Sequence, residues 1–406
     1  MMSTISIDRP AWEVADVIRR YSGAFLKRFG SSLSGTQRKA LRDLAACRTA
    51  ILGGHVQRCL DCGQERIAYN SCRNRHCPKC QALARATWLE REATYLLPVE
   101  YHHVVFTLPQ EVAELARTNP ALVYDRLFQA AAGTLREVAA NPRRLGAAIG
   151  VLAVLHTWGQ NLHHHPHLHC VVTGGGLSCN AQGRVDASPR WRSCRPGFFL
   201  PVRILSQVFR GKFLALLREA FNHGQLIGTH ALEAASNLSA LITRLSAKPW
   251  VVYVKPPFGG PTQVLKYLAR YTHRVALSNR RLIAVEDGRV TFRYKDYADD
   301  HRTKQMTLDA TEFLRRFVQH VLPKGFVKIR HFGLLANRRR AEWLAVCRRL
   351  LFVAVVPSRP SSESNEGVEP AKPPHCPHCG GCRFTYRELA AEPHTGPAFS
   401  APRDTS

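Results

Sequence analysis

Two Cys-x-x-Cys pairs near the N-terminus constrain the fold of this chain more than any other feature. They are CLDC at 59–62 and CPKC at 77–80, and 14 residues separate them. This spacing is typical of treble-clef and ribbon sites, in which each pair closes one knuckle around a tetrahedral zinc ion. Pro78 and Gly63 suit the turns of such knuckles. We therefore predict a Zn²⁺ site whose ligands are Cys59, Cys62, Cys77 and Cys80.

The other cysteines leave several interpretations open. Of the 13 cysteines in the chain, six lie between 47 and 80 and three between 376 and 382. In a reducing cytosol, clustered cysteines are better explained as metal ligands or buried thiols than as disulfides. A second, interleaved zinc site could use Cys47, His55, Cys72 and His76, or Cys47 could be a buried thiol at a helix end. The motif HCPHCGGC at 375–382 holds only one knuckle, so either a histidine completes it (His375, His378 or His394) or it is a degenerate ribbon.

The charge of the chain indicates its partner. Lys and Arg number 57 against 30 Asp and Glu, which gives a formal charge of +27. A field of this strength favours a polyanion, and nucleic acid is the commonest one. No stretch reaches the roughly 18 apolar residues that would span a bilayer, and the first 20 residues lack the apolar segment of a signal peptide. We expect DNA as the partner, no membrane association and a cytoplasmic location.

Hydrophobic periodicity predicts an α+β fold with helices on one face of a sheet. Helical patterns cover 10–50, 81–97, 110–140, 204–222, 231–246, 262–277, 311–322 and 338–351. Strand patterns cover 101–109, 149–157, 167–173 and 250–254, and a hairpin with Asp-Gly at its turn is predicted at 281–296. The segment from about 357 is rich in Pro, Ser and Glu, which predicts a disordered tail.

The histidine-rich segment HTWGQNLHHHPHLHCVVTGGG at 156–176 predicts a metal site. Side chains alternate faces along a strand, so His167 and His169 point the same way while Leu168 points into the core. Two imidazoles about 7 Å apart on one face can hold one divalent ion. The third ligand could be His156 across the strand ladder, or the side-chain oxygen of Gln160. Such a site keeps the open coordination positions that a catalytic metal requires.

An alternative explanation of these histidines is a solvated basic loop. We favour this alternative for the three histidines before Pro166, which are His163, His164 and His165. For His167 and His169, the neighbouring Pro166 and the apolar CVV that follows favour a strand face instead.

A second reactive element is the segment KYLARYTHR at 266–274. On a helix, Tyr267 and Tyr271 share one face and lie about 6 Å apart. A neighbouring basic stripe that could hold phosphates consists of Lys266, Arg270 and Arg274. A phenol is a weak nucleophile unless its target is activated, for example by a divalent ion that polarises the phosphoryl oxygen. The two tyrosines alone could equally be core aromatics, and it is their occurrence together with the histidine pair that favours catalysis.

These segments resemble the two-tyrosine HUH transposases, the insertion-sequence enzymes associated with rolling-circle transposition. The strings that carry the resemblance are SCRNRHCPKCQ (71–81), YHHVVFTLP (101–109), HTWGQNLHHHPHLHCVVTGGG (156–176), YLARYTHRVALSN (267–279) and RHFGLLANRRR (330–340). The similarity spans about residues 10–352. It places the HUH pair of the family on His167 and His169, and its tyrosine pair on Tyr267 and Tyr271.

The resemblance implies a replication-initiator-like endonuclease core with an antiparallel sheet, an N-terminal zinc module, and Mg²⁺ or Mn²⁺ at the histidine pair. It also implies cleavage and transfer of single DNA strands at insertion-sequence ends through a 5′-phosphotyrosine, in the bacterial cytoplasm close to the nucleoid. The domains expected are 1–97 (helical, zinc-binding, DNA-recognising), 98–352 (catalytic) and 353–406 (flexible tail with a cysteine knuckle).

The sequence is compatible with more than one role for several features. Arg73 and Arg75 lie between the cysteine ligands and either contact DNA or are solvated surface charge. The same chemistry would serve a replication initiator, and a zinc-dependent DNA-binding regulator would need none of it. The sequence does not decide between a monomer and a homo-oligomer.

Overall fold

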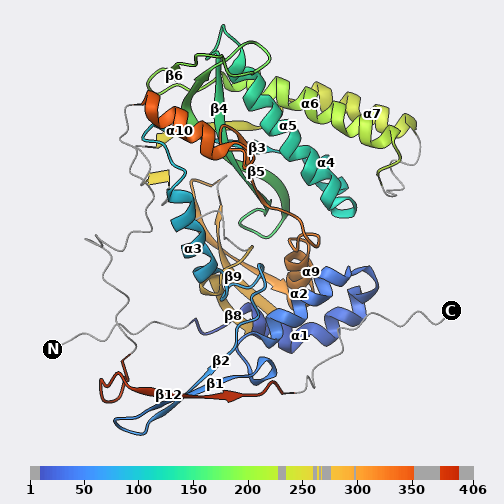
Figure 1. Cartoon of the computed structure of the whole chain (residues 1–406). Coiled ribbons are helices and arrows are strands. Elements are labelled where there is room, and N and C mark those ends of the chain that lie inside the picture. Colours follow the sequence, from blue (N-terminus) through green and yellow to red (C-terminus); the bar gives the residue numbers. More distant parts are fainter. Residues whose placement is uncertain are drawn as a thin grey trace. The chain divides into compact units, whose positions relative to one another are not determined.

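The computed structural model describes residues 10–226, 235–258, 263–264, 267, 276–296, 299–351 and 375–392. The chain divides into two compact units. Unit 1 consists of Met1–Gln81, Leu277–Val321 and Val356–Ser406, and unit 2 of Ala82–Ala276 and Leu322–Val355. The predicted domains were contiguous, whereas unit 1 assembles three segments that are far apart in the sequence (Figure 1).

Unit 1 contains three α-helices and two small antiparallel sheets among its described residues. The helices are α1 (Val14–Phe29), α2 (Gly35–Ala46) and α9 (Ala310–Val318). One sheet has the strand order β12-β1-β2, formed by Phe384–Leu389, Gly54–Cys59 and Glu65–Tyr69. The other has the order β10-β9-β8, formed by Arg302–Asp309, Arg289–Asp296 and Leu282–Glu286.

Local sequence signals explain how these elements begin and turn. Helix α2 starts at a capping box, in which the Ser34 hydroxyl accepts from the backbone N–H of Gln37 and the Gln37 side chain accepts from the Ser34 N–H. The β8–β9 turn contains Asp287 and Gly288, both with positive φ, as the tight hairpin turn requires. The predicted Asp-Gly hairpin is therefore present.

Unit 2 is built on an antiparallel sheet with the strand order β11-β4-β5-β3-β7, to which β6 is added beside β5. The strands are β3 (Tyr101–Thr107), β4 (Ala147–Trp158), β5 (His164–Ser178), β6 (Trp191–Ser193), β7 (Val252–Phe258) and β11 (Ile329–Gly333). The helices are α3 (Gln81–Ala93), α4 (Gln110–Thr118), α5 (Pro120–Ala140), α6 (Val202–Asn222), α7 (Ala235–Ala247) and α10 (Arg340–Leu350). This architecture confirms the predicted α+β class with an antiparallel sheet and helices.

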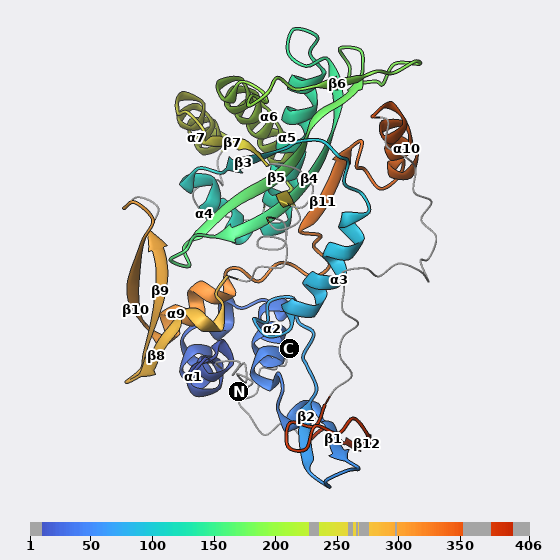
Figure 2. The same ribbon diagram turned by 90° about the vertical axis from the view of Figure 1, so that its left-hand side faces the viewer.

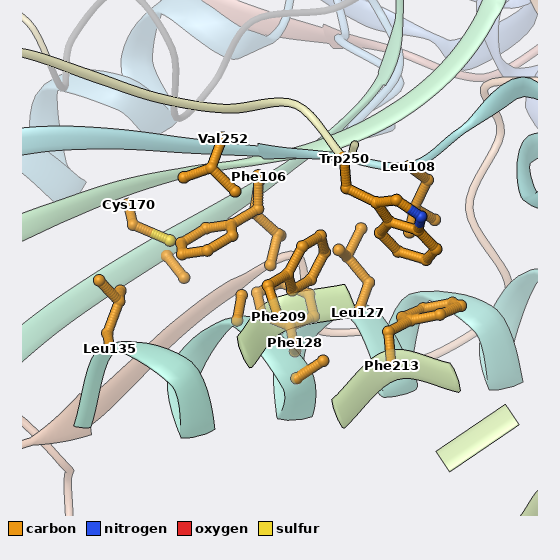
Figure 3. Packing of buried hydrophobic residues seen from close by; sticks show 14 of the residues in the cluster. Phe106, Leu108, Leu127, Phe128, Leu135, Cys170, Phe209, Phe213, Trp250 and Val252 are labelled. Atoms are coloured by element: carbon orange, nitrogen blue, oxygen red, sulfur yellow. The ribbon is translucent and has the colours of Figure 1, made fainter. Parts of the chain in front are cut away.

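The two faces of this sheet differ in what covers them. Helices α4, α5, α6 and α7 lie on one face, and α3 and α10 pack against the other (Figure 2). The prediction that helices cover only one face was therefore wrong. The first face forms the main core, where Phe106, Phe209 and Trp250 pack with ring centroids 4.9 and 5.4 Å apart (Figure 3). The second face holds a smaller apolar cluster that includes Trp88, Tyr101, Leu152, Val154 and Val171. Residues two apart in a strand share a face. His156 therefore lies on this second face with Val154 of β4, and His167 and His169 lie on it with Val171 of β5.

Within the part of the chain that the structure describes, none of the helices combines the length and apolarity needed to cross a bilayer.

Candidate metal centre and tyrosine site

The register of β4 and β5 brings three histidines together. His156 lies directly opposite His167, and Val154 lies opposite His169. The ligand nitrogens of His156, His167 and His169 all lie within 4.8 Å of one another, and Nε2 of His167 is 3.1 Å from Nε2 of His169. Two ligands about 2.1 Å from one ion, at right angles, are about 3 Å apart. The three imidazoles therefore fit a divalent ion, while Gln160 lies in the turn between the two strands.

Burial prepares these imidazoles for a cation. Desolvation lowers the pKa of His167 to about 4 and that of His169 well below its ordinary value, since charge is disfavoured away from water. Neutral imidazole is the form that ligates metals. His167 Nδ1 lies 2.7 Å from the carbonyl oxygen of His165 and donates to it, which leaves Nε2 as the ligand atom.

The histidines before Pro166 do not all belong to a solvated loop. His163 is exposed, but His164 is buried and His165 is half-buried, and both lie in strand β5 rather than in a loop. The Nε2 of His164 is 2.8 Å from the Tyr124 hydroxyl, and its Nδ1 is 3.0 Å from the Ala113 carbonyl. The prediction for His164 was wrong because two polar partners in α4 and α5 replace its water, and local sequence does not show them.

Tyr267 lies beside the histidine group. Its hydroxyl oxygen is 3.1 Å from Nδ1 of His169 and 2.5 Å from Nε2 of His103. Val264, three residues earlier in the sequence, is fully buried in the cluster of the second sheet face, against which Tyr267 also packs. The residues Tyr271, Lys266, Arg270 and Arg274 lie outside the described residues.

His103 is the residue of this site that the sequence analysis missed. It lies on β3 opposite Val171, and the alternate residues Val104 and Phe106 of the same strand point into the main core, so the His103 side chain points to the second sheet face. Its Nε2 is 2.9 Å from Nδ1 of His169. The alternation in YHHVVF contains the signal, because Val104 and Phe106 mark the core face and leave His103 on the other.

The donor and acceptor roles of His169, Tyr267 and His103 can be assigned from their protonation. Burial lowers the pKa of His103 to about 3, so the ring is neutral and its Nε2 can accept. If Nε2 of His169 ligates a metal, its Nδ1 carries the proton and donates to the Tyr267 oxygen. The Tyr267 O–H is then left to donate to Nε2 of His103. The hydroxyl is held between a donor and an acceptor.

The cysteines of unit 1 form two groups of four thiols, and these differ from the predicted sets. One group is Cys47, Cys72, Cys77 and Cys80, and the other is Cys59, Cys62, Cys376 and Cys379. The predicted set Cys59, Cys62, Cys77 and Cys80 is therefore not brought together, and His55 and His76 belong to neither group. Sequence spacing alone could not reveal this, because β1 pairs with a strand more than 300 residues away.

The first cysteine group has the dimensions of a zinc site. Sγ of Cys80 is 3.5 Å from that of Cys47 and 3.6 Å from that of Cys72, and Sγ of Cys77 is 3.6 Å from that of Cys47. A tetrahedral ion with bonds of about 2.3 Å holds its sulfurs about 3.8 Å apart. Between these ligands, Arg73 is exposed, whereas Arg75 is half-buried and burial lowers its pKa.

Comparison with known proteins identifies similar chains. A family model described as "Putative transposase" matches residues 150–342, and one described as "Transposase zinc-binding domain" matches residues 17–108. The chain is 54% identical to the "Putative transposase y4qJ" of Sinorhizobium fredii, over 84% of this chain and 85% of that relative. It is 31% identical to the "Transposase for insertion sequence element IS801" of Pseudomonas savastanoi pv. phaseolicola, over 74% of this chain and 70% of that relative. No solved structure matches the chain.

Proposed function

Because this chain belongs to the family of insertion-sequence transposases that includes the IS801 enzyme, we propose that it cuts single DNA strands with Tyr267 as the nucleophile. The observation that carries this proposal is the 3.1 Å distance between the Tyr267 hydroxyl and Nδ1 of His169, whose other nitrogen faces His167. A phenol held beside a metal-binding imidazole set is the arrangement that phosphoryl transfer to tyrosine needs.

The reaction exchanges one phosphoester bond for another. The Tyr267 oxygen attacks the phosphorus, an O–P bond forms, and the bond from phosphorus to the 3′ oxygen breaks. The DNA then carries a free 3′-hydroxyl, and its 5′-phosphate is joined to the tyrosine. Nε2 of His103 accepts the hydrogen bond of the phenol and so orients its oxygen, while Nδ1–H of His169 stabilises the developing phenolate. The phenol proton passes to solvent, and the leaving 3′ oxygen takes up a proton from solvent.

Histidines of the β4–β5 ladder would hold Mg²⁺ or Mn²⁺ for this step. The residues that would hold the ion are His156, His167 and His169. When bound, such an ion would supply Lewis-acid polarisation of a phosphoryl oxygen. Tyr271, four residues after Tyr267, would act as the second nucleophile, so that one tyrosine keeps the first DNA end while the other attacks the second end or the target.

The basic charge of the chain supports the choice of substrate. The chain has a formal charge of +27. Each DNA phosphate that a Lys or Arg side chain neutralises releases condensed counterions, and this release favours binding. The zinc-binding domain matched at residues 17–108 contains all four thiols of the first cysteine group, which would bind Zn²⁺ and stabilise this module. Arg73 and Arg75 within it would contact the DNA ends.

The test is covalent capture of DNA. Labelled single-stranded oligonucleotides from the ends of the encoding element are incubated with Mn²⁺ and the wild-type chain, Tyr267→Phe, Tyr271→Phe or both substitutions together. Denaturing gels then show the tyrosine–DNA adduct. The double variant should form none, and the control Tyr294→Phe, on β9 in unit 1, should match the wild type. Undiminished adduct in the double variant would refute the mechanism.

A further inference from the structure

The second group of thiols brings together two Cys-x-x-Cys knuckles that are more than 300 residues apart in the sequence, at 59–62 and 376–379. Sγ of Cys59 is 3.6 Å from that of Cys379, and Sγ of Cys62 is 3.7 Å from that of Cys376. Each of these distances links one thiol of the N-terminal knuckle to one of the C-terminal knuckle. Both agree with the separation of about 3.8 Å in a tetrahedral thiolate site. The matched zinc-binding domain ends at residue 108, so it does not include the C-terminal pair.

The two knuckles have the same backbone geometry. Their sequences are CLDCG at 59–63 and CPHCG at 376–380. In the first, the N–H of Gly63 donates to the carbonyl of Cys59 at 2.9 Å, and Gly63 has φ of 73°. In the second, the N–H of Gly380 donates to the carbonyl of Cys376 at 2.8 Å, and Gly380 has φ of 76°. A left-handed glycine directly after the second cysteine closes each turn, so both pairs aim their thiols in an equivalent way.

The strand that follows the C-terminal knuckle is docked beside β1 with little hydrophobic support. Strand β12 pairs antiparallel with β1 and lies next to it in Figure 1. Its six residues are exposed or half-buried, including Tyr386 with 60% exposure. Beyond the ladder, Nε of Arg383 donates to the Asp61 carboxylate at 2.9 Å, an exposed contact of small energetic weight. Burial of apolar surface therefore cannot account for this docking, and a tightly bound ion could.

We propose that Cys59, Cys62, Cys376 and Cys379 bind a second zinc ion, which fastens residues 375–392 to the N-terminal hairpin. This site is structural, because four thiolates saturate a tetrahedral ion and leave no open position. The remaining cysteine of the motif, Cys382, lies 3.0 Å from Nδ1 of His375 and outside the four-thiol group. The C-terminal strand thus joins the zinc-binding module only when metal is present.

The number of thiolate-bound ions tests the site in the full-length protein. The chain is loaded with Co²⁺ under reducing conditions, and thiolate-to-cobalt charge-transfer absorption is recorded, to which an all-histidine site does not contribute. The wild type should saturate at two thiolate-bound equivalents, and Cys376→Ser with Cys379→Ser at one. The matched control Cys382→Ser should retain two. A wild type with one equivalent, or a double variant with two, would overturn the proposal.

Retention of the C-terminal strand tests the docking separately. A protease recognition sequence is introduced near residue 365, and the full chain is cleaved there after zinc loading. The C-terminal fragment should coelute with the rest of the protein in gel filtration and separate after zinc is removed with 1,10-phenanthroline. A fragment that separates while zinc is still bound, or stays after zinc is removed, would contradict the fastening role.

Discussion

Replacement of His103 tests how the Tyr267 hydroxyl is prepared for attack. The 2.5 Å contact between His103 Nε2 and the phenol is the shortest that Tyr267 makes with the two histidines beside it. The substitution His103→Phe keeps an aromatic ring against His169, with which His103 stacks at a centroid distance of 5.1 Å. It removes the Nε2 atom that accepts from the phenol and that lies 2.9 Å from Nδ1 of His169. Formation of the tyrosine–DNA adduct should therefore slow without loss of the fold.

The expected size of the effect follows from the role of the acceptor. Because burial lowers the pKa of His103 to about 3, this ring orients the phenol through a hydrogen bond and does not hold its proton. Loss of one such hydrogen bond at the nucleophile should cost about 1–1.4 kcal/mol of activation free energy, or roughly five- to tenfold in rate. The variant His103→Gln can still accept this hydrogen bond, so it should recover most of the lost rate.

The assay is single-turnover adduct formation at saturating Mn²⁺, because loss of a ligand's hydrogen-bond partner can also weaken metal binding by about 10–100-fold. The matched control is His102→Phe. His102 precedes His103 on β3, points to the core and stacks on Phe199 at 4.8 Å. Among the described residues, its buried Nε2 has no hydrogen-bond partner to lose. An adduct rate for His103→Phe within twofold of the wild type would refute the assigned role.

The metal site, the core and a buried histidine each lead to another measurable outcome. The pair His167→Ala and His169→Ala should abolish tight Mn²⁺ binding in an electron paramagnetic resonance titration, because one imidazole cannot retain the ion; unchanged affinity would place the ion elsewhere. Phe209→Ala should lower the free energy of unfolding by about 3–5 kcal/mol, since Phe209 is fully buried against Phe106; a loss below about 1 kcal/mol in urea denaturation would contradict this packing. Burial lowers the pKa of His164 from 6.5 to about 4, so the unfolded chain binds the proton first, and stability that is present above pH 6.5 is lost as pH falls toward 4. Between pH 7 and 5 this loss is about 2 kcal/mol, and urea titrations of His164→Gln should show a pH dependence weaker by that amount, whereas an equal dependence would rule out His164 as its source.

Local sequence was sufficient wherever one element determines the geometry by itself. Strand alternation put His167 and His169 on one face, and the Asp-Gly pair predicted the β8–β9 turn. The apolar strands and helical periods predicted the α+β class. These inferences succeed because the covalent geometry of a strand or a tight turn repeats every few residues and is independent of distant partners.

Tertiary structure decided which distant elements meet. The 14-residue spacing predicted that the knuckle at 59–62 pairs with that at 77–80, yet strand pairing joins it to the knuckle at 376–379. His103 belongs to the site because β3 lies beside β5. His164 is buried rather than solvated because Tyr124 and Ala113 supply its polar partners. All of these outcomes depend on sheet order and side-chain packing across tens to hundreds of residues. The local sequence around a cysteine or histidine does not show which distant residue it will contact. The tertiary structure alone therefore determines these partners.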